Sequence, residues 1–184
     1  MAQSTKVVTG KVRFSYANIF KARSFGDNQP AKFSIVLLID KNDKKTLDKI
    51  NAAINTAIQE GISSKWNGKK PANLHLPLRD GDAERPDAPE CAGKYFINCN
   101  SNNRPGIVDA ELNEIIDPDE VYSGCYGRAS INFFAYNTNG NRGIGAGLNN
   151  IQKLADGDRL GGSKASAEDD FGDGFEDDDA LSDF

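Results

Sequence analysis

The stretch that most constrains the fold is residues 121–137, VYSGCYGRASINFFAYN, because it alternates between two kinds of side chain. Its odd positions from Val121 to Ala135 are all small or apolar and include Cys125, Ile131 and Phe133, whereas its even positions combine aromatic, cationic and amide side chains. A period of two residues is typical of a β-strand with one buried face. We therefore expect a long strand here, with its odd positions in the core.

The even positions of the same stretch describe the second face of this strand. Tyr126, Arg128, Phe134 and Tyr136 place aromatic rings close to a guanidinium group. Unpaired bases stack on aromatic rings while cationic side chains contact the phosphates, so this face predicts a surface for single-stranded nucleic acid. The alternative is that these rings pack beneath a helix in a sheet buried on both faces, which would leave Arg128 in need of a buried partner.

The other periodic segments predict a small barrel. Further strand-like patterns lie at residues 6–20, 31–40, 74–78, 94–101 and from residue 141 onward. Residues 43–61 carry apolar side chains at spacings of three and four after a candidate N-cap, Asp43, and predict one internal helix. These elements favour a mainly β fold, an antiparallel Greek-key barrel of the OB type, over a sandwich or an alternating α/β fold. We assign the barrel to residues 1–160.

Three finer expectations concern single positions. In the first strand, Val8, Val12, Phe14 and Tyr16 should share one face. The helix should reach its capped C-terminus at Gly61. The GIGAG motif from residue 143 does not open a helix after a strand, so it is only a weak signal for a phosphate-binding loop, and we discard that interpretation.

The C-terminal segment, residues 161–184, is expected to form a disordered tail rich in glycine and acidic side chains. Residues 167–184 hold nine carboxylate side chains and no Lys or Arg. The whole chain has a net charge of −5, whereas residues 1–166 carry 22 basic against 18 acidic side chains. Residues 1–79 alone carry 14 basic against 5 acidic side chains, which predicts a positive patch for an anionic partner or, alternatively, an ordinary solvated lysine face.

Residues suited to catalysis or metal binding are sparse. The single histidine, His75, lies between two leucines with no nucleophile motif nearby. Cys91, Cys99 and Cys125 are odd in number and form no CxxC pair, so we expect buried free thiols. Together with His75 they lack the local spacing of a structural zinc site. We expect neither an enzyme nor a cofactor.

Two other functions stay open. A metal-dependent nuclease would use the carboxylates of Asp80, Asp82 and Glu84, although this segment has the composition of a turn. A protein-interaction adaptor would act through the tail alone.

Several strings are distinctive in combination, namely VTGKVRFSYANIFKA, KFSIVLLIDK, SNNRPGIVD, YSGCYGRASINFFAY and GIGAGLNNIQKLADGDRLGG. With them, the chain resembles a family of phage-encoded single-stranded-DNA-binding proteins with an OB fold. The resemblance implies a protein that coats unpaired DNA with little sequence preference during phage replication, recombination or repair. It also implies an acidic tail ending in an aromatic residue, here Phe184, that modulates DNA binding and recruits partner proteins.

Cationic and aromatic side chains are expected to line the DNA groove. The expected DNA-binding residues are Lys11, Arg13, Tyr16, Phe20, Lys21, Arg23, Trp66, Lys94, Phe96, Tyr126, Arg128, Phe134, Tyr136 and Arg142. For Trp66 two roles are left open: it is either a platform on which bases stack or a residue of the core. The tail residues expected to contact partner proteins are Asp177, Asp178, Asp179, Leu181, Asp183 and Phe184.

The expected partners are single-stranded DNA and, through the tail, replication or recombination proteins, and the protein is expected to act as a monomer or a dimer. No apolar run reaches the length of a membrane span, and the N-terminus lacks the apolar segment of a signal peptide. The expected location is therefore the cytoplasm, that of the host cell if the protein is phage-encoded.

Overall fold

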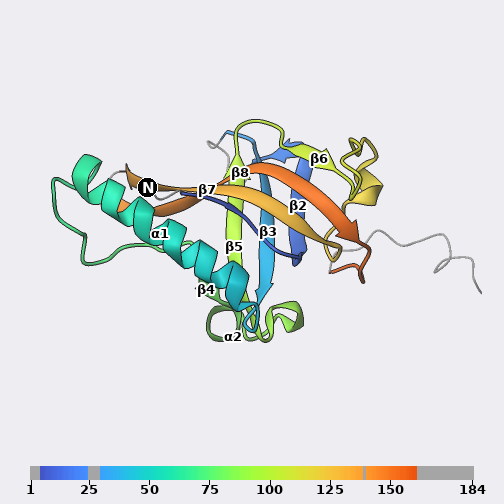
Figure 1. The fold of residues 1–184 in the computed structure, drawn as a ribbon, viewed down its shortest axis with the longest axis horizontal. Helices are drawn as coiled ribbons and strands as arrows, with labels where there is room; N and C mark the ends of the chain where they lie inside the picture. The colour runs from blue at the N-terminus through green and yellow to red at the C-terminus, as the bar shows by residue number, and fades with distance from the viewer. Residues whose placement is uncertain (1–4, 25–29, 139, 161–184) are drawn as a thin grey trace, which may run out of the picture.

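The computed structural model describes residues 5–24, 30–138 and 140–160 of the chain. Five long strands pair in a closed ring (Figure 1). In ring order they are β2 (Val12–Arg23), β3 (Lys32–Asp40), β5 (Lys94–Ser101), β8 (Asn141–Ala155) and β7 (Tyr126–Thr138), and β7 pairs again with β2. A closed five-stranded barrel is the OB architecture, so the expected fold class is confirmed.

Three short strands extend the barrel. They are β1 (Lys6–Val8) beside β7, β4 (Arg79–Asp80) beside β5, and β6 (Gly106–Val108) beside β8. Most pairings are antiparallel, but β8 runs parallel to β5 and to β6. The barrel is therefore mainly antiparallel with one parallel junction, because strand direction cannot alternate throughout a ring with an odd number of strands.

Helix α1 (Lys44–Ser64) follows β3 and packs mainly against β7. As expected, Asp43 caps it, since its side chain accepts a hydrogen bond of 3.3 Å from the backbone N–H of Thr46. The helix does not end at Gly61 but continues to Ser64. Gly61 serves a close approach instead, because a Cβ atom there would lie 2.8 Å from the Trp66 ring and 2.6 Å from the Cβ of Ala135.

The first expected strand is interrupted twice. It divides into β1 and β2, so Val7 faces the core and Val8 is 40% exposed. Within β2, the register with β3 shifts between Ser15 and Asn18, and Tyr16 lies between them with a left-handed φ of 46°. This irregularity turns Tyr16 outward to 58% exposure, so it does not share the buried face of Phe14.

The barrel holds its core inside and a smaller apolar cluster outside. The main core includes Phe14, Leu37, Ile97 and Phe133. The smaller cluster consists of Val36, Leu38, Cys91 and Phe96. It forms where the outer face of β3 and β5 meets the segment containing α2 (Gly81–Glu84) and η1 (Pro89–Cys91). The second half of β3, residues 35–39, is therefore buried on both faces.

The three cysteines are buried free thiols, as expected, and burial raises the pKa of the Cys99 thiol. Of the helices in the described ranges, none has both the length and the apolar character required to cross a membrane.

Candidate nucleic-acid interface

A groove of 830 Å³ crosses the outer faces of β2, β3 and β5. Its polar lining comprises Tyr16, Asn18, Arg23, Lys32, Ser34, Arg85, Asn98 and Asn100. The strand period explains this lining, because Lys32 and Ser34 alternate along β3 with residues that face the barrel interior. The register pairs Ser34 with Asn100, so the polar side chains of neighbouring strands meet on one surface.

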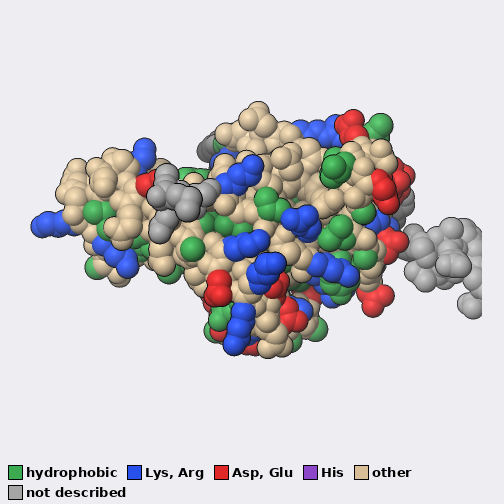
Figure 2. All heavy atoms as spheres, in the orientation of Figure 1, with side chains coloured by type: hydrophobic (Ala, Val, Ile, Leu, Met, Phe, Trp, Pro, Cys, Tyr) green, Lys and Arg blue, Asp and Glu red, His purple; other side chains and the backbone are tan. Residues whose placement is uncertain are grey.

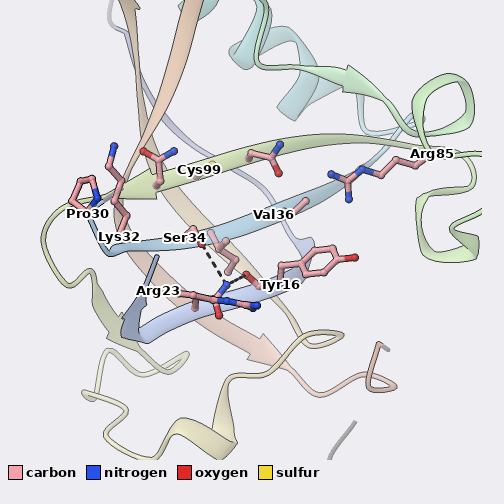
Figure 3. A pocket seen from close by; sticks show the side chains of 12 residues that line it. Tyr16, Arg23, Pro30, Lys32, Ser34, Val36, Arg85 and Cys99 are labelled. Atoms are coloured by element: carbon pink, nitrogen blue, oxygen red, sulfur yellow. Dashed lines mark hydrogen bonds between the residues drawn. The ribbon is translucent and has the colours of Figure 1, made fainter. Parts of the chain in front are cut away.

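Tyr16 and Arg85 stand at one end of this groove, and Lys32 stands at the other (Figure 3). The Arg85 guanidinium lies 5.9 Å from the centre of the Tyr16 ring and 4.4 Å from that of Phe96. The side-chain amide of Asn18 donates to the backbone carbonyl of Tyr16 at 3.2 Å and to the Ser34 hydroxyl at 3.4 Å. These contacts hold the bulge that exposes the tyrosine ring.

A second groove of 410 Å³ continues from the first, since both are lined by Lys32, Asn98 and Asn100. It extends the surface to His75, Leu76, Phe134 and Tyr136. We call the two grooves together the trough. It runs from Tyr16 on β2 to the aromatic end of β7.

The glycines of β8 form the floor beneath this aromatic end. Phe134 pairs with Gly145 and Tyr136 with Gly143 across the β7–β8 ladder. A Cβ atom on Gly145 would lie 2.6 Å from the Phe134 ring, and one on Gly143 would lie 2.7 Å from the Tyr136 hydroxyl. The GIGAG motif therefore lets aromatic side chains lie close to the backbone of β8, which is a known way to combine glycine with aromatic residues across strands.

Among the described residues, the charged side chains that line the trough are all cationic. Its cationic lining residues are Arg23, Lys32, Arg79 and Arg85. Arg79 is partly neutralised by Glu84, 2.9 Å away. None of the described residues that line either groove is an aspartate or glutamate. The trough thus combines positive charge, exposed rings and amides in one continuous surface.

Four predicted DNA-binding residues line the trough, namely Tyr16, Arg23, Phe134 and Tyr136. Phe134 is 47% exposed, so it is available to a ligand. Arg142 is exposed next to the trough, where its backbone carbonyl accepts a 3.0 Å hydrogen bond from the N–H of His75. The alternation that predicted the β7 face is present in the structure.

Other predicted residues form a separate group near the end of the described chain. The amine of Lys11 and the guanidinium of Arg13 lie 5.2 and 5.6 Å from the centre of the Tyr126 ring. Arg13 also donates to the carbonyls of Gly124 and Asp158, at 3.1 and 2.8 Å. These residues line neither groove, and they join β2 to β7 and to the segment after β8.

Two more predicted residues lie outside the trough on exposed surface. Arg128 is exposed, and its Nε donates at 3.1 Å to the carbonyl of Thr9. Lys21 is exposed on β2 and lines neither groove.

Two predicted stacking residues, Trp66 and Phe96, are buried and need correction, and two other predicted residues, Phe20 and Lys94, line neither groove. Trp66 is a core residue, 4% exposed, whose indole N–H donates to the carbonyl of Tyr136 at 3.2 Å. Phe96 is 3% exposed, because the α2–η1 segment covers that part of β5. Phe20 packs partly against the main core. Lys94 is paired with Asp40 at 3.3 Å, so its charge is already partly neutralised.

Sequence reasoning missed the middle of the trough. Lys32, Ser34, Asn98 and Asn100 were not predicted, although they occupy alternate positions of strands that were recognised. The available signal was this parity, since Asn98 and Asn100 alternate with buried positions in β5. Arg85 had no comparable signal, because it reaches the groove from the irregular segment after α2.

Comparison with known proteins agrees with this geometry. A family model described as "Enterobacter phage Enc34, ssDNA-binding protein" matches residues 5–181. The chain belongs to this family. The resemblance drawn from its sequence strings is therefore confirmed.

Solved structures and a curated relative are also similar to this chain. The single-stranded DNA-binding protein from bacteriophage Enc34 in complex with ssDNA matches with a TM-score of 0.73 and 26% identity, over 88% of this chain and 95% of that chain. The phage T7 single-stranded DNA binding protein gp2.5 shares the fold, with a TM-score of 0.60 and 14% identity over 94% of this chain and 95% of that chain. "Putative protein p50" of Acyrthosiphon pisum secondary endosymbiont phage 1 is 29% identical over 174 residues, which cover 89% of this chain and 91% of that protein.

The carboxylates of the nuclease hypothesis are engaged within the chain. Lys41 contacts Asp80 at 2.7 Å and Asp82 at 2.8 Å, and these hydrogen bonds hold the pKa of both carboxyl groups below its usual range. Glu84 pairs with Arg79. In the described part of the chain, no group of three or more His, Cys, Asp or Glu side chains is arranged to hold a metal ion. The geometry favours a structural clamp between the end of β3 and α2.

Proposed function

We propose that the protein binds single-stranded DNA along the trough, with little sequence preference, during phage replication, recombination or repair. The observation that carries the proposal is the trough itself, which places exposed rings at both ends and cations between them without a lining carboxylate. Membership of a family described as ssDNA-binding supports it. So does the Enc34 structure, whose title describes a complex with ssDNA.

Each part of the trough has a role in this binding. Bases stack on Tyr16, Phe134 and Tyr136, and stacking on aromatic side chains tolerates any base because every base has a π-face. Lys32 and Arg85 contact phosphates. The amides of Asn98 and Asn100 offer both donors and acceptors, so they adapt to different base edges. This composition favours coating of unpaired DNA over reading of its sequence.

The acidic tail is proposed to regulate this binding from close by. Leu160, the last described residue, donates its backbone N–H to the carbonyl of Ser123 at 3.0 Å. It also lines a hollow of 340 Å³ together with Tyr16, Asn18 and Arg23, which are trough residues. The described chain therefore ends beside the trough, and the tail is attached at that point.

Anions tethered at such a point have a high effective concentration, so the tail competes with DNA. The predicted partner contacts at the chain end, Asp177, Asp178, Asp179, Leu181, Asp183 and Phe184, lie outside the described residues, and recruitment of replication or recombination proteins through them is part of the proposal. The protein acts by binding alone, without a catalytic step, in the cytoplasm of the host cell.

Titration of a labelled oligo(dT) strand at several salt concentrations tests the proposal. Affinity should fall with salt with a slope of about −0.7 per neutralised phosphate, and Lys32→Gln should make the slope shallower by about 0.7. Lys70→Gln is the matched control, because Lys70 is exposed outside the trough. Equal slopes for wild type and Lys32→Gln would remove Lys32 from the DNA path. Incubation of the labelled strand with magnesium should leave it intact, whereas its cleavage would support the nuclease alternative.

A further inference from the structure

A second groove lies away from the trough, between β1 and α1. Its volume is 440 Å³, and it is lined by Lys6, Val7, Val8, Lys49, Ala52, Ala53 and Thr56. Val8 is 40% exposed in it, so part of its apolar surface is open to solvent. The groove has an apolar floor and a cationic rim, and no aspartate or glutamate is among its described lining residues. We call it the β1–α1 groove.

A projecting loop, residues 109–120, has the opposite character. It carries six carboxylate side chains and no Lys or Arg. Its Leu112 and Ile116 are 72% and 75% exposed, the highest values among the large apolar side chains of the described residues. We call this segment the acidic loop.

The acidic loop is held in a defined shape. The Asp109 carboxylate accepts backbone N–H bonds from Glu111 and Asn113, each at 2.9 Å. The Gln152 amide donates to the carbonyl of Asp109 at 3.3 Å, which ties the loop to β8. Leu112 has a left-handed φ of 68°, a conformation in which Asn or Gly is the usual residue. The chain therefore keeps an exposed leucine where a small polar residue would fold more easily, and such local conflicts point to a function.

We propose that the acidic loop of one copy docks into the β1–α1 groove of a second copy of this chain when both are bound to single-stranded DNA. The two surfaces are complementary, because the apolar side chains of the loop meet the apolar floor and its carboxylates meet Lys49 on the rim. This inference rests on the proposed function, since the DNA strand supplies the second copy at close range.

The placement of the two surfaces determines what such a contact builds. In Figure 1, helix α1 runs from the lower centre of the molecule to its left end, and the segment after β6 lies at the upper right. Figure 2 shows acidic side chains along the right-hand margin of the same view and basic side chains over its left end. A contact between two different surfaces joins copies head to tail, and on a linear DNA strand such contacts produce a row. Because neither surface includes a trough residue, each copy in the row keeps its trough available to DNA.

The experiment uses the full chain and two labelled oligo(dT) strands. One strand is about 12 nucleotides long and accommodates a single copy, and the other is about 70 nucleotides long and accommodates several. Mass photometry at protein concentrations below saturation measures how copies distribute on the long strand. Wild-type protein should form clusters, with fully coated strands beside bare ones.

Two charge reversals identify the contact. Lys49→Glu places a like charge against the acidic loop of the next copy, and Glu111→Lys places one against the groove, so each variant alone should lose clustering. In an equimolar mixture, the groove of each variant can receive the loop of the other with opposite charges in contact, so clustering should return. Leu112→Asn, which suits the left-handed backbone, should lower the clustering constant about tenfold through lost apolar burial.

The outcomes separate this inference from the proposed function. All three variants should bind the short strand as wild type does. Random distribution of wild type on the long strand, or no recovery in the mixture, would overturn the inference; the second result is the one expected if the chain's own acidic tail fills the groove. If wild type binds neither strand, the proposed function fails as well.

Discussion

Removal of the Phe134 ring isolates the contribution of base stacking. The ring is 47% exposed and lies over Gly145, so Phe134→Ala removes a surface on which a base can stack and uncovers a glycine backbone. The side chain carries no charge. The variant should therefore weaken binding of single-stranded DNA without changing its salt dependence.

The expected size of the effect follows from the exposure of the ring. Stacking is worth about 1–3 kcal/mol per base, which corresponds to a rise in Kd of roughly 5-fold to 150-fold. A fully buried Phe→Ala change costs about 3–5 kcal/mol of stability, and this ring is almost half exposed, so the stability loss should stay below about 2 kcal/mol. Binding should suffer more than folding.

Fluorescence anisotropy with labelled oligo(dT) and thermal unfolding measure the two quantities on the same samples. Leu154→Ala is the matched control, because Leu154 is 37% exposed on β8 and lines neither groove. A Phe134→Ala protein that melts much earlier yet binds DNA normally would show that the ring supports the fold and takes no part in stacking.

Three further variants or conditions test other parts of the structure. Gly145→Ala should weaken DNA binding, because the new Cβ atom would come within 2.6 Å of the Phe134 ring. Gly147→Ala is the control and should leave DNA binding unchanged, because a Cβ atom there makes only ordinary contacts at 3.6 Å. Equal affinities of the two variants would contradict the proposed floor. Lowering the pH from about 6 to 3 should reduce the melting temperature, because the pKa of the Asp80 carboxyl group is lowered in the folded protein. The contribution of this group to stability is present above the usual carboxyl pKa and is lost as the pH falls through the lowered value. Lys41→Met should weaken this pH dependence, and an unchanged profile would argue against the clamp. The single tryptophan should emit at short wavelength and resist quenching by iodide, and strong quenching would place it outside the core.

Periodic patterns predicted the elements well where one physical rule determines the outcome. The alternation in residues 121–137 follows from the pleat of a strand, and β7 buries Ile131 and Phe133 as that rule requires. The helix and its cap at Asp43 follow equally from local spacing and local hydrogen bonding.

The residues whose burial was not predicted are covered by segments that lie far away in the sequence. Trp66 stands among glycine, asparagine and lysine residues in the sequence, and its burial depends on the carbonyl of Tyr136, distant along the chain, and on the missing side chain of Gly61. In β5, Phe96 and Asn98 occupy equivalent parity, yet α2 and η1 cover one and leave the other in the trough. The alternation of a strand shows which residues share a face, but it does not show which part of that face another segment will bury.

The parallel junction of the barrel sets the order in which the binding surface can be completed. Asn100 of β5 pairs with Gly147 of β8, and this junction joins segments far apart in the chain. Closing such a long loop is entropically costly, so it is expected late in folding. The groove across β2, β3 and β5 can form from residues that precede position 101, whereas Phe134 and Tyr136 join it only after β8 has paired. An unfinished chain therefore presents only the first groove of the trough, and completion of the last strand makes the trough continuous.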